Sequence, residues 1–242
     1  MSDALASPRY YAQYGEDRLL DRIFKKANGT AVEVGGFDGM TGSNTFFFEQ
    51  KGWTTLLVEP NPALAAVIRK NRKCRIAEYA VGECSREVIL QVPTGDETIA
   101  SVSTNPWQLR RMQSGGDINT ITVQQRRLDD VLADAGLASI DFITIDVEGH
   151  EMQVLEGFDL ARWQPRIVIL EDNSSGRTED VPIYMELRGY VRFCSTGCND
   201  WYCSKSDPLV TRWALLRTES IKALKGFKHI GMVFLRRGLN IQ

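Results

Sequence analysis

Residues 32–39 of the chain read VEVGGFDG. The apolar run 31–35 predicts a buried β-strand, and the glycines that follow it allow a tight turn in which a ligand can approach bare backbone. The spacing is E-x-G-G-x-x-G, so Phe37 stands where the dinucleotide-binding pattern has its middle glycine. Residues 40–44 separate this turn from the next expected helix. The stretch therefore predicts a ligand-binding turn at a strand end, without the helix N-terminus that would bind a pyrophosphate.

Downstream, short apolar runs alternate with segments of helical composition, which predicts an α/β fold with a parallel sheet covered by helices. The expected strands are 31–35, 54–60, 76–81, 88–92, 118–124, 140–147, 166–170, 190–194, 200–204 and 231–236. The expected helices are 45–51, 62–71, 128–135, 151–157 and 182–189. A long polar connection, around 93–117, links two of the strands, and such connections often carry function. The composition does not change along the chain in a way that would mark a second domain.

Glu59 ends the second expected strand, twenty residues after Gly39. A carboxylate at that position can accept hydrogen bonds from both hydroxyls of a ribose, so the turn and the acid together indicate an adenosine-type cofactor. Glu33 and Asp38 are acids with no phosphate-binding site beside them. Because carboxylates attract positive charge, they favour a cofactor with a cationic amino-acid tail. S-adenosylmethionine fits, because it carries an ammonium and a sulfonium. The alternative is a structural turn followed by an exposed strand-end glutamate.

A second acidic group, residues 146–151 (DVEGHE), follows the most apolar expected strand, and residues 171–173 (EDN) follow the next one. Because ligands collect beyond the carboxyl ends of parallel strands, we expect both groups to face the same crevice as the glycine turn. Two roles stay open. His150 could be the general base that removes a proton from a hydroxyl. Alternatively, hard oxygen ligands could hold Mg²⁺, and the candidates are Asp146, Asp172 and Asn173.

Composition and charge narrow the class of protein. The 242 residues are 43% hydrophobic and 25% charged with a formal net charge of −2, so a globular chain is expected and no global basic field attracts nucleic acid or an anionic membrane. The longest apolar runs fall far short of the ~20 residues that span a bilayer. The N-terminus lacks the features of a secretory signal, so a cytoplasmic location is expected.

Five cysteines, an odd number without a secretion signal, are best interpreted as reduced thiols. Cys194, Cys198 and Cys203 have a C-x3-C-x4-C spacing that is not usual for zinc, so loop and strand thiols are favoured over a metal site. A local basic patch could form from four arginines, although solvated surface is the more frequent outcome at such spacing. These arginines are Arg110, Arg111, Arg126 and Arg127.

The motifs together resemble those of the FkbM-type methyltransferases, a family of class I S-adenosylmethionine-dependent enzymes. The matching segments cover about residues 11–172: 11–17 (YAQYGED), 32–39 with 43–45 (SNT), 52–53 (GW), 58–61 (VEPN), 128–130 (LDD), 145–151 (IDVEGHE) and 154–157 (VLEG). The Asp172-Asn173 pair departs from the family pattern and is more similar to the metal-binding pair of catechol-type O-methyltransferases. Residues 194–203 match no family feature.

The resemblance implies a doubly wound, seven-stranded, mostly parallel Rossmann-like sheet and methyl transfer to a hydroxyl oxygen of a sugar, polyketide or other natural product. It implies an N-terminal arm and helix (1–29) on the cofactor site, and one class I methyltransferase domain (30–242) with a long inserted loop around 93–117. The cofactor-binding residues expected by the match are Gln13, Glu33, Gly35, Asp38, Ser43, Asn44, Glu59, Pro60 and Asp146. The expected catalytic residues are His150, Asp146 and Glu148. The competing functions are a Mg²⁺-dependent O-methyltransferase, a nicotinamide-dependent oxidoreductase and a nucleotide-binding module without chemistry.

Overall fold

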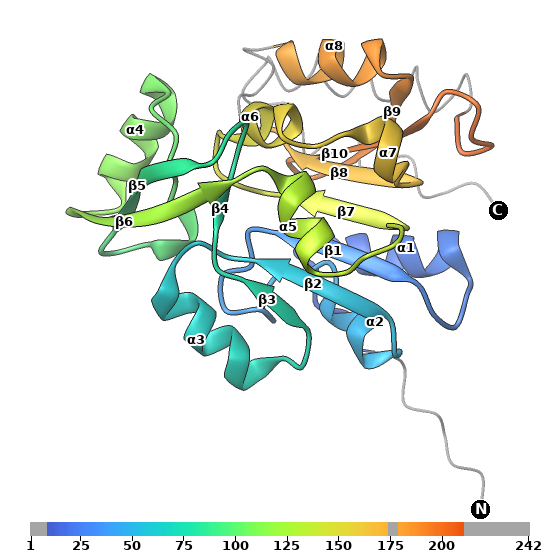
Figure 1. The fold of residues 1–242 in the computed structure, drawn as a ribbon, viewed down its shortest axis with the longest axis horizontal. Coiled ribbons are helices and arrows are strands. Elements are labelled where there is room, and N and C mark those ends of the chain that lie inside the picture. The colour runs from blue at the N-terminus through green and yellow to red at the C-terminus, as the bar shows by residue number, and fades with distance from the viewer. Residues whose placement is uncertain (1–8, 174–178, 211–242) are drawn as a thin grey trace, which may run out of the picture.

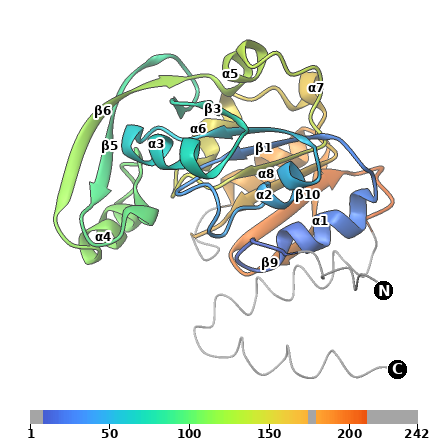
Figure 2. The same ribbon diagram turned by 90° about the horizontal axis from the view of Figure 1, so that it is seen from below.

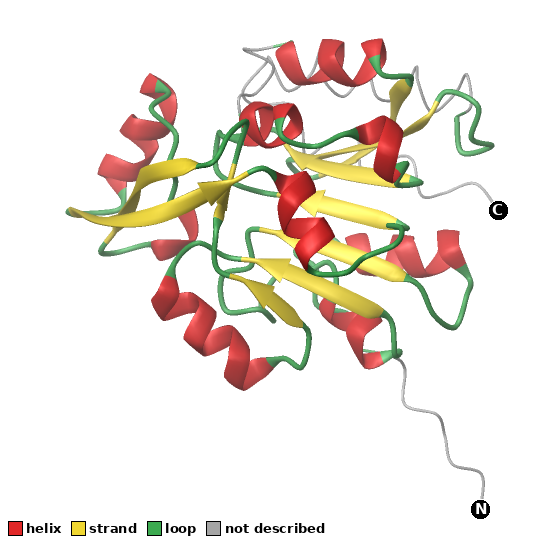
Figure 3. Cartoon of the chain, in the orientation of Figure 1, coloured by secondary structure: helices red, strands yellow, loops and turns green. Residues whose placement is uncertain are grey.

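The computed structural model describes residues 9–173 and 179–210. Seven strands form the main sheet: β1 (Thr30–Val34), β2 (Thr54–Val58), β3 (Arg75–Ala77), β7 (Phe142–Ile145), β8 (Ile167–Glu171), β9 (Tyr190–Thr196) and β10 (Asn199–Ser204). Their order across the sheet is β3-β2-β1-β7-β8-β10-β9 (Figures 1 and 3). The first five of these are parallel, whereas β10 runs antiparallel to both β8 and β9. The prediction of a doubly wound, mostly parallel sheet is confirmed.

The chain reverses its direction of travel across the sheet between β1 and β7. From β1 it proceeds outward to β2 and β3, and it later returns to add β7 and β8 on the other side of β1. Such a switch point leaves a crevice beyond the carboxyl ends of the strands, because the crossover connections leave in opposite directions. Ligands of open α/β sheets bind in this crevice.

Alternate residues of the central strands point to opposite faces and build two cores. Ile143 of β7 packs in the core under the helices α5 (Leu128–Asp134), α6 (Glu151–Glu156), α7 (Leu160–Trp163) and α8 (Asp180–Leu187). The neighbouring Phe142 packs in the core on the other face, together with residues of α1 (Glu16–Phe24) and α2 (Phe46–Gln50). Helix α3 (Pro62–Asn71) joins β2 to β3 and begins with an Asn61 cap, whose side chain accepts from the Ala63 N–H at 3.0 Å. Among the described residues, no helix is both long and apolar enough to cross a membrane.

A second, three-stranded sheet is inserted between β3 and α5. It consists of β4 (Ala80–Val81), β6 (Ile118–Arg126) and β5 (Arg86–Pro93), in that order. Between β5 and β6 lie the short 3₁₀ helix η1 (Glu97–Ile99) and helix α4 (Pro106–Ser114). Figure 2 shows this insert at one end of the molecule.

Two sequence expectations change here. The single strand expected over 76–81 is two pieces, because β3 pairs with β2 in the main sheet and β4 pairs with β6 in the insert. The connection expected as a loop around 93–117 contains α4, which Pro106 begins and Gly115 ends. The expected strand at 231–236 lies outside the described residues.

Gly35, immediately after β1, lies against the backbone of Asp146, which follows β7. Its φ is +87°, and a Cβ atom there would lie 1.8 Å from the backbone carbonyl oxygen of Asp146. Any side chain would therefore push apart the two strands that border the switch point. The sequence predicts a cofactor contact at this glycine, but the protein's own backbone already requires a residue without a side chain here.

Gly35→Ala should lower the free energy of unfolding by more than about 3 kcal/mol, since both the left-handed backbone and the clash with Asp146 oppose it. Gly52→Ala is the matched control, because Gly52 has a φ of +88° and nothing within 4 Å of the added Cβ. The control should lose only about 1–2 kcal/mol. Urea denaturation measures both variants, and equal losses would contradict the proposed backbone clash.

Candidate active site

A cavity of about 670 Å³ opens beyond the carboxyl ends of β1, β2 and β7. It brings together residues that the sequence analysis selected from five separate segments. The predicted site residues on its wall are Gln13, Glu33, Gly35, Ser43, Asn44, Glu59, Pro60, Asp146, Glu148, His150 and Asn173. Two predicted residues, Asp38 and Asp172, are not on this wall.

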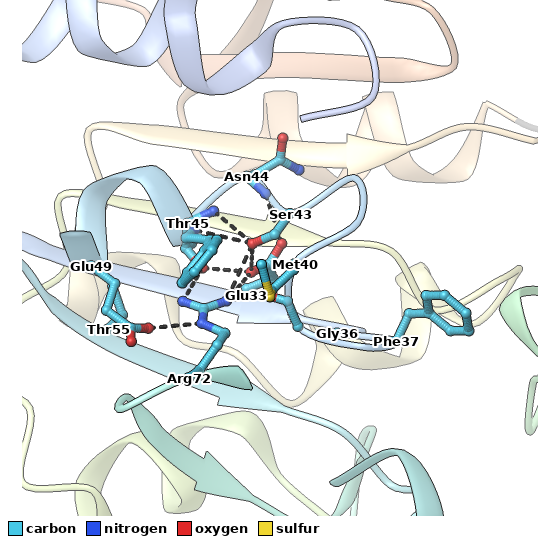
Figure 4. A network of polar contacts seen from close by, with 12 residues as sticks. Glu33, Gly36, Phe37, Met40, Ser43, Asn44, Thr45, Glu49, Thr55 and Arg72 are labelled. Atoms are coloured by element: carbon cyan, nitrogen blue, oxygen red, sulfur yellow. Dashed lines mark hydrogen bonds and ion pairs between the residues drawn. The ribbon is translucent and has the colours of Figure 1, made fainter. Parts of the chain in front are cut away.

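Glu33, on β1, is buried in a network of the protein's own donors (Figure 4). One carboxylate oxygen accepts from the Asn44 N–H at 2.8 Å, and the other accepts from the Ser43 hydroxyl at 2.7 Å. The second oxygen also pairs with the Arg72 guanidinium at 3.1 Å, and the Arg72 side chain is 0% exposed. The sequence analysis missed Arg72, because it lies at the end of α3, 39 positions from its partner.

The network fixes the loop between β1 and α2. Arg72 also donates to the Gly39 carbonyl at 3.2 Å and to the Thr45 hydroxyl at 3.0 Å, so one buried guanidinium holds the middle of this loop to its end. Removing one partner of a buried ion pair leaves an uncompensated charge, which makes the pair a strong constraint on the loop. Beside it, the side-chain oxygen of Asn44 is buried and has no hydrogen-bond partner among the described residues. Asn44 lines the cavity, and its unpartnered oxygen has the capacity to accept a hydrogen bond from a cationic ligand group.

Asp38 stabilises the turn itself. Its carboxylate accepts from the backbone N–H groups of Met40 and Thr41, at 2.8 and 2.7 Å, and from the Thr41 hydroxyl at 2.7 Å. Partial burial would raise the pKa of Asp38, but these hydrogen bonds outweigh it and lower the pKa below its usual range. The acid therefore holds residues 38–41 in place from outside the cavity wall.

Glu59, after β2, faces the glycine turn across the cavity. One oxygen accepts from the backbone N–H groups of Gly36 and Phe37, at 3.2 and 3.3 Å, and the other accepts from the Asn61 N–H at 2.9 Å. Burial raises the pKa of Glu59, and the three backbone donors oppose that rise. Oε2 already accepts two donors, whereas Oε1 accepts one and can take a further hydrogen bond, so Glu59 can accept from a ribose hydroxyl.

Three carboxylates meet at the ends of β7 and β8. Asp146, Glu148 and Glu171 each place an oxygen within 4.8 Å of the others. The expected grouping of Asp146 with Asp172 is not what the structure shows, since Asp172 is off the cavity wall and its backbone N–H donates to the Cys198 carbonyl at 2.8 Å. Asn173 does join the cluster, with its amide nitrogen 3.1 Å from Glu148.

The pKa values of the three crowded acids are raised. Burial, followed by the charge of Asp146, raises the pKa of Glu148 to about 8, although Arg111 opposes the rise. Burial and the two neighbouring acids raise the pKa of Glu171 to about 12. Asp146 is open to the cavity, yet dense protein surroundings also raise its pKa. The cluster therefore holds protons at neutral pH and favours a ligand that brings positive charge.

The loop that carries Glu148 has an unusual backbone. Glu148 has a φ of +55° and Gly149 has a φ of +91°. The insert supports this conformation, since the Ser101 hydroxyl donates to the Glu148 carbonyl at 2.8 Å and the Ser103 hydroxyl donates to the Gly149 carbonyl at 3.0 Å. Arg111 of α4 forms an ion pair with the Glu148 carboxylate. The sequence analysis noted these serines only as part of a polar connection.

The donors to Glu148 all reach the same oxygen. The side-chain nitrogens of Arg111, Gln108 and Asn173 contact Oε2. No hydrogen bond to Oε1 forms among the described residues. One oxygen is thus fixed in position while the other can take a proton from a ligand in the cavity.

His150 caps the start of α6 and also lines the cavity. Burial lowers its pKa to about 4, Glu83 opposes this fall and Arg86 adds to it, so its imidazole is neutral at neutral pH. Its Nε2 is buried without a partner among the described residues. A histidine with so low a pKa is a weak proton acceptor.

The cysteines remain free thiols in the described part of the chain. Cys198 lies on the cavity wall, with its sulfur 3.5 Å from Glu171. Among the described residues, the metal-ligand geometry groups only the three carboxylates and includes no cysteine.

The strand order, the antiparallel β10 and the cavity at the switch point define a class I methyltransferase architecture. The Methyltransferase FkbM domain matches residues 33–195 of the chain. The chain therefore belongs to the FkbM methyltransferase family, as its motifs predicted, and it is a methyltransferase.

Two known methyltransferases are similar to the chain in sequence. The chain is 27% identical over 164 residues to the 2-O-methyltransferase NoeI of Sinorhizobium fredii (strain NBRC 101917 / NGR234), covering 64% of this chain and 67% of NoeI. It is 35% identical over 86 residues to the methyltransferase sdnD of Sordaria araneosa, covering 31% of this chain and 33% of sdnD.

Solved structures show distant similarity. A TehB-like SAM-dependent methyltransferase from Corynebacterium glutamicum aligns with a TM-score of 0.42 and 12% identity, over 80% of this chain and 89% of that chain. Precorrin-6y C5,15-methyltransferase from Geobacter metallireducens aligns with a TM-score of 0.39 and 11% identity, over 77% and 84%.

Proposed function

We propose that the chain transfers the methyl group of S-adenosylmethionine to a hydroxyl oxygen of a small molecule such as a sugar or polyketide. The observation that carries the proposal is the cavity in which the glycine turn and Glu59 face the acidic cluster. It supports a cofactor with a ribose at one end and positive charge at the other. The name of NoeI, a 2-O-methyltransferase, supports oxygen as the acceptor atom.

We assign the ribose to Glu59 and the amino-acid tail to the side of the cavity formed by Asn44 and Gln13. The buried, unpartnered Asn44 oxygen supports an ammonium partner. Glu33 acts on the tail through the loop that it fixes, since its own oxygens already accept four donors. The N-terminal arm contributes Tyr11, Gln13 and Tyr14 to the wall, which supports the prediction that residues 1–29 belong to the cofactor site.

When bound, S-adenosylmethionine supplies a methyl group on a positively charged sulfur. Glu148 is protonated in the ligand-free chain at neutral pH, and positive charge placed beside it favours the ionised form. Its free Oε1 can then accept the proton of an acceptor hydroxyl, while Asp146 provides counter-charge. The sequence analysis predicted His150 as the general base; the free Oε1 and the raised pKa of Glu148, with the lowered pKa of His150, favour Glu148 in that role.

A Mg²⁺-dependent reaction is the second candidate, because the carboxylates of Asp146, Glu148 and Glu171 are the oxygen ligands that this ion prefers. The donor set fits the ion poorly, since the Arg111 guanidinium already pairs with Glu148. We therefore favour the metal-free reaction.

Removal of the Glu59 carboxylate should weaken cofactor binding, because hydrogen bonding from the ribose to this carboxylate is lost. In the wild type, S-adenosylhomocysteine should bind more tightly than its 2′-deoxy analogue by about 1.5–3 kcal/mol, the range for hydrogen bonds to charged groups. In Glu59→Gln this difference should shrink to below about 1 kcal/mol. Isothermal titration calorimetry measures all four affinities. An undiminished difference would refute the ribose assignment, and a wild type that binds neither ligand would refute the proposed function.

Glu148→Gln should lower the rate of methyl transfer by ~100–10,000-fold, whereas His150→Ala should lower it less than about tenfold. Transfer of tritium from labelled S-adenosylmethionine to a hydroxylated acceptor measures the rate. Glu97→Gln is the matched control, because Glu97 lines the same cavity but lies outside the acidic cluster.

The pH profile separates the two bases. If Glu148 is the base, kcat/KM for the cofactor, which reports the free enzyme, should fall as the pH drops below about 8, because the carboxylate takes up a proton. If His150 is the base, the fall should occur only near pH 4. A profile that stays flat between pH 8 and 5 would exclude Glu148.

A further inference from the structure

One face of α4 borders a second cleft, of about 630 Å³. Pro106, Trp107, Arg110 and Arg111 line it, and they share this face because residues three and four apart lie side by side on a helix. Asn173, from the end of β8, lines the opposite part. Gln108 and Met112 of the same helix are buried, so α4 is anchored while its other face borders the cleft.

The cleft adjoins the cofactor cavity. Arg111 and Asn173 line both spaces, and both contact the Glu148 carboxylate. A molecule that fills the second cleft therefore ends beside the candidate base. No other described residues line both spaces, so these two side chains form the junction.

The charge of the cleft is positive. Arg111 is balanced by Glu148, but Arg110 is exposed and has no hydrogen bond or ion pair within residues 9–173 and 179–210. By contrast, Arg126 and Arg127 pair with acids of α5. The described lining of the cleft includes no carboxylate, so the charge of Arg110 is uncompensated there.

Trp107 adds an aromatic surface to the same cleft. It is half-buried, and a Cβ on Gly149 would lie 3.1 Å from its ring, so the ring is packed close against the backbone of the catalytic loop. A ring wedged in this way gives a rigid contact surface at low entropic cost. An aromatic face beside a free guanidinium suits a flat or ring-shaped molecule that carries an anionic group.

We propose that this cleft is the acceptor site and that it selects hydroxyl compounds carrying a carboxylate, sulfate or phosphate group. The anionic group lies on Arg110, the ring of the acceptor lies against Trp107, and the hydroxyl to be methylated passes Arg111 to reach Glu148. The assignment rests on the proposed methyl transfer, and it adds the chemical class of the acceptor.

A matched pair of ligands tests this directly: p-nitrophenyl β-D-glucuronide and p-nitrophenyl β-D-glucoside, which differ only in the carboxylate. Binding is measured by calorimetry with S-adenosylhomocysteine present, so that the result does not depend on turnover. The glucuronide should bind at least about tenfold more tightly, and this preference should weaken with added salt. Arg110→Gln should abolish the preference and Arg110→Lys should retain part of it.

Lys70→Gln is the charge-matched control. Lys70 is exposed on α3, outside the cleft, so its substitution removes the same net charge as Arg110→Gln without changing the cleft. It should leave the preference intact. Equal affinities for the two glycosides, including no measurable binding of either, would overturn the proposal, as would an unchanged preference in Arg110→Gln. Binding of S-adenosylhomocysteine alone reports separately on the proposed function, and Arg110→Gln should leave it unchanged.

Discussion

The rest of the site depends on the crowding of three carboxylates at the ends of two buried strands. Carboxylate oxygens of Asp146, Glu148 and Glu171 lie within 4.8 Å of one another, and in the described part of the chain one guanidinium, that of Arg111, is paired to the group. Like charges at this distance in a poorly solvated cavity cannot all ionise, so their pKa values rise and the cluster retains protons. A cationic cofactor relieves this repulsion. The repulsion among the three carboxylates thus supports both the proposed binding of a sulfonium ligand and the proposed ionisation of Glu148 to act as a base.

The insert and the glycine turn maintain this arrangement from two sides. Ser101 and Ser103 hold the left-handed backbone at Glu148, and α4 supplies the arginine that fixes one of its oxygens. On the other side, the buried Glu33–Arg72 pair fixes the loop that presents Asn44 (Figure 4). A left-handed backbone at a residue other than glycine, as at Glu148, persists only where several surrounding contacts stabilise it. The insert therefore supports the loop that carries Glu148 and also borders the proposed acceptor cleft.

Much of the fold and part of the site were predictable from the sequence. Apolar runs that end in glycine or acid identified β1, β2, β7 and β8, because buried parallel strands and their carboxyl ends have a local signature. Arg72 and Arg111 were not assigned to the site, because their partners lie 39 and 37 positions away and an arginine in a helix carries no sign of what it pairs with. Asp172 was preferred to Glu171 as a ligand because the Asp172-Asn173 pair is similar to the metal-binding pair of catechol-type O-methyltransferases. Strand-end residues alternate in direction, so a shift of one residue moves a side chain off the wall. Helix α4 was hidden in a polar segment with few apolar positions.

The central claim is that the acidic cluster holds protons that a sulfonium displaces. Calorimetric titrations at pH 7 in two buffers of different ionisation enthalpy count the protons released when S-adenosylmethionine or S-adenosylhomocysteine binds. Only the first ligand carries the positive sulfur, so it should release about one proton more than the second, and its relative affinity should increase from pH 6 to pH 8. Equal proton release for the two ligands, with relative affinities independent of pH, would contradict the account.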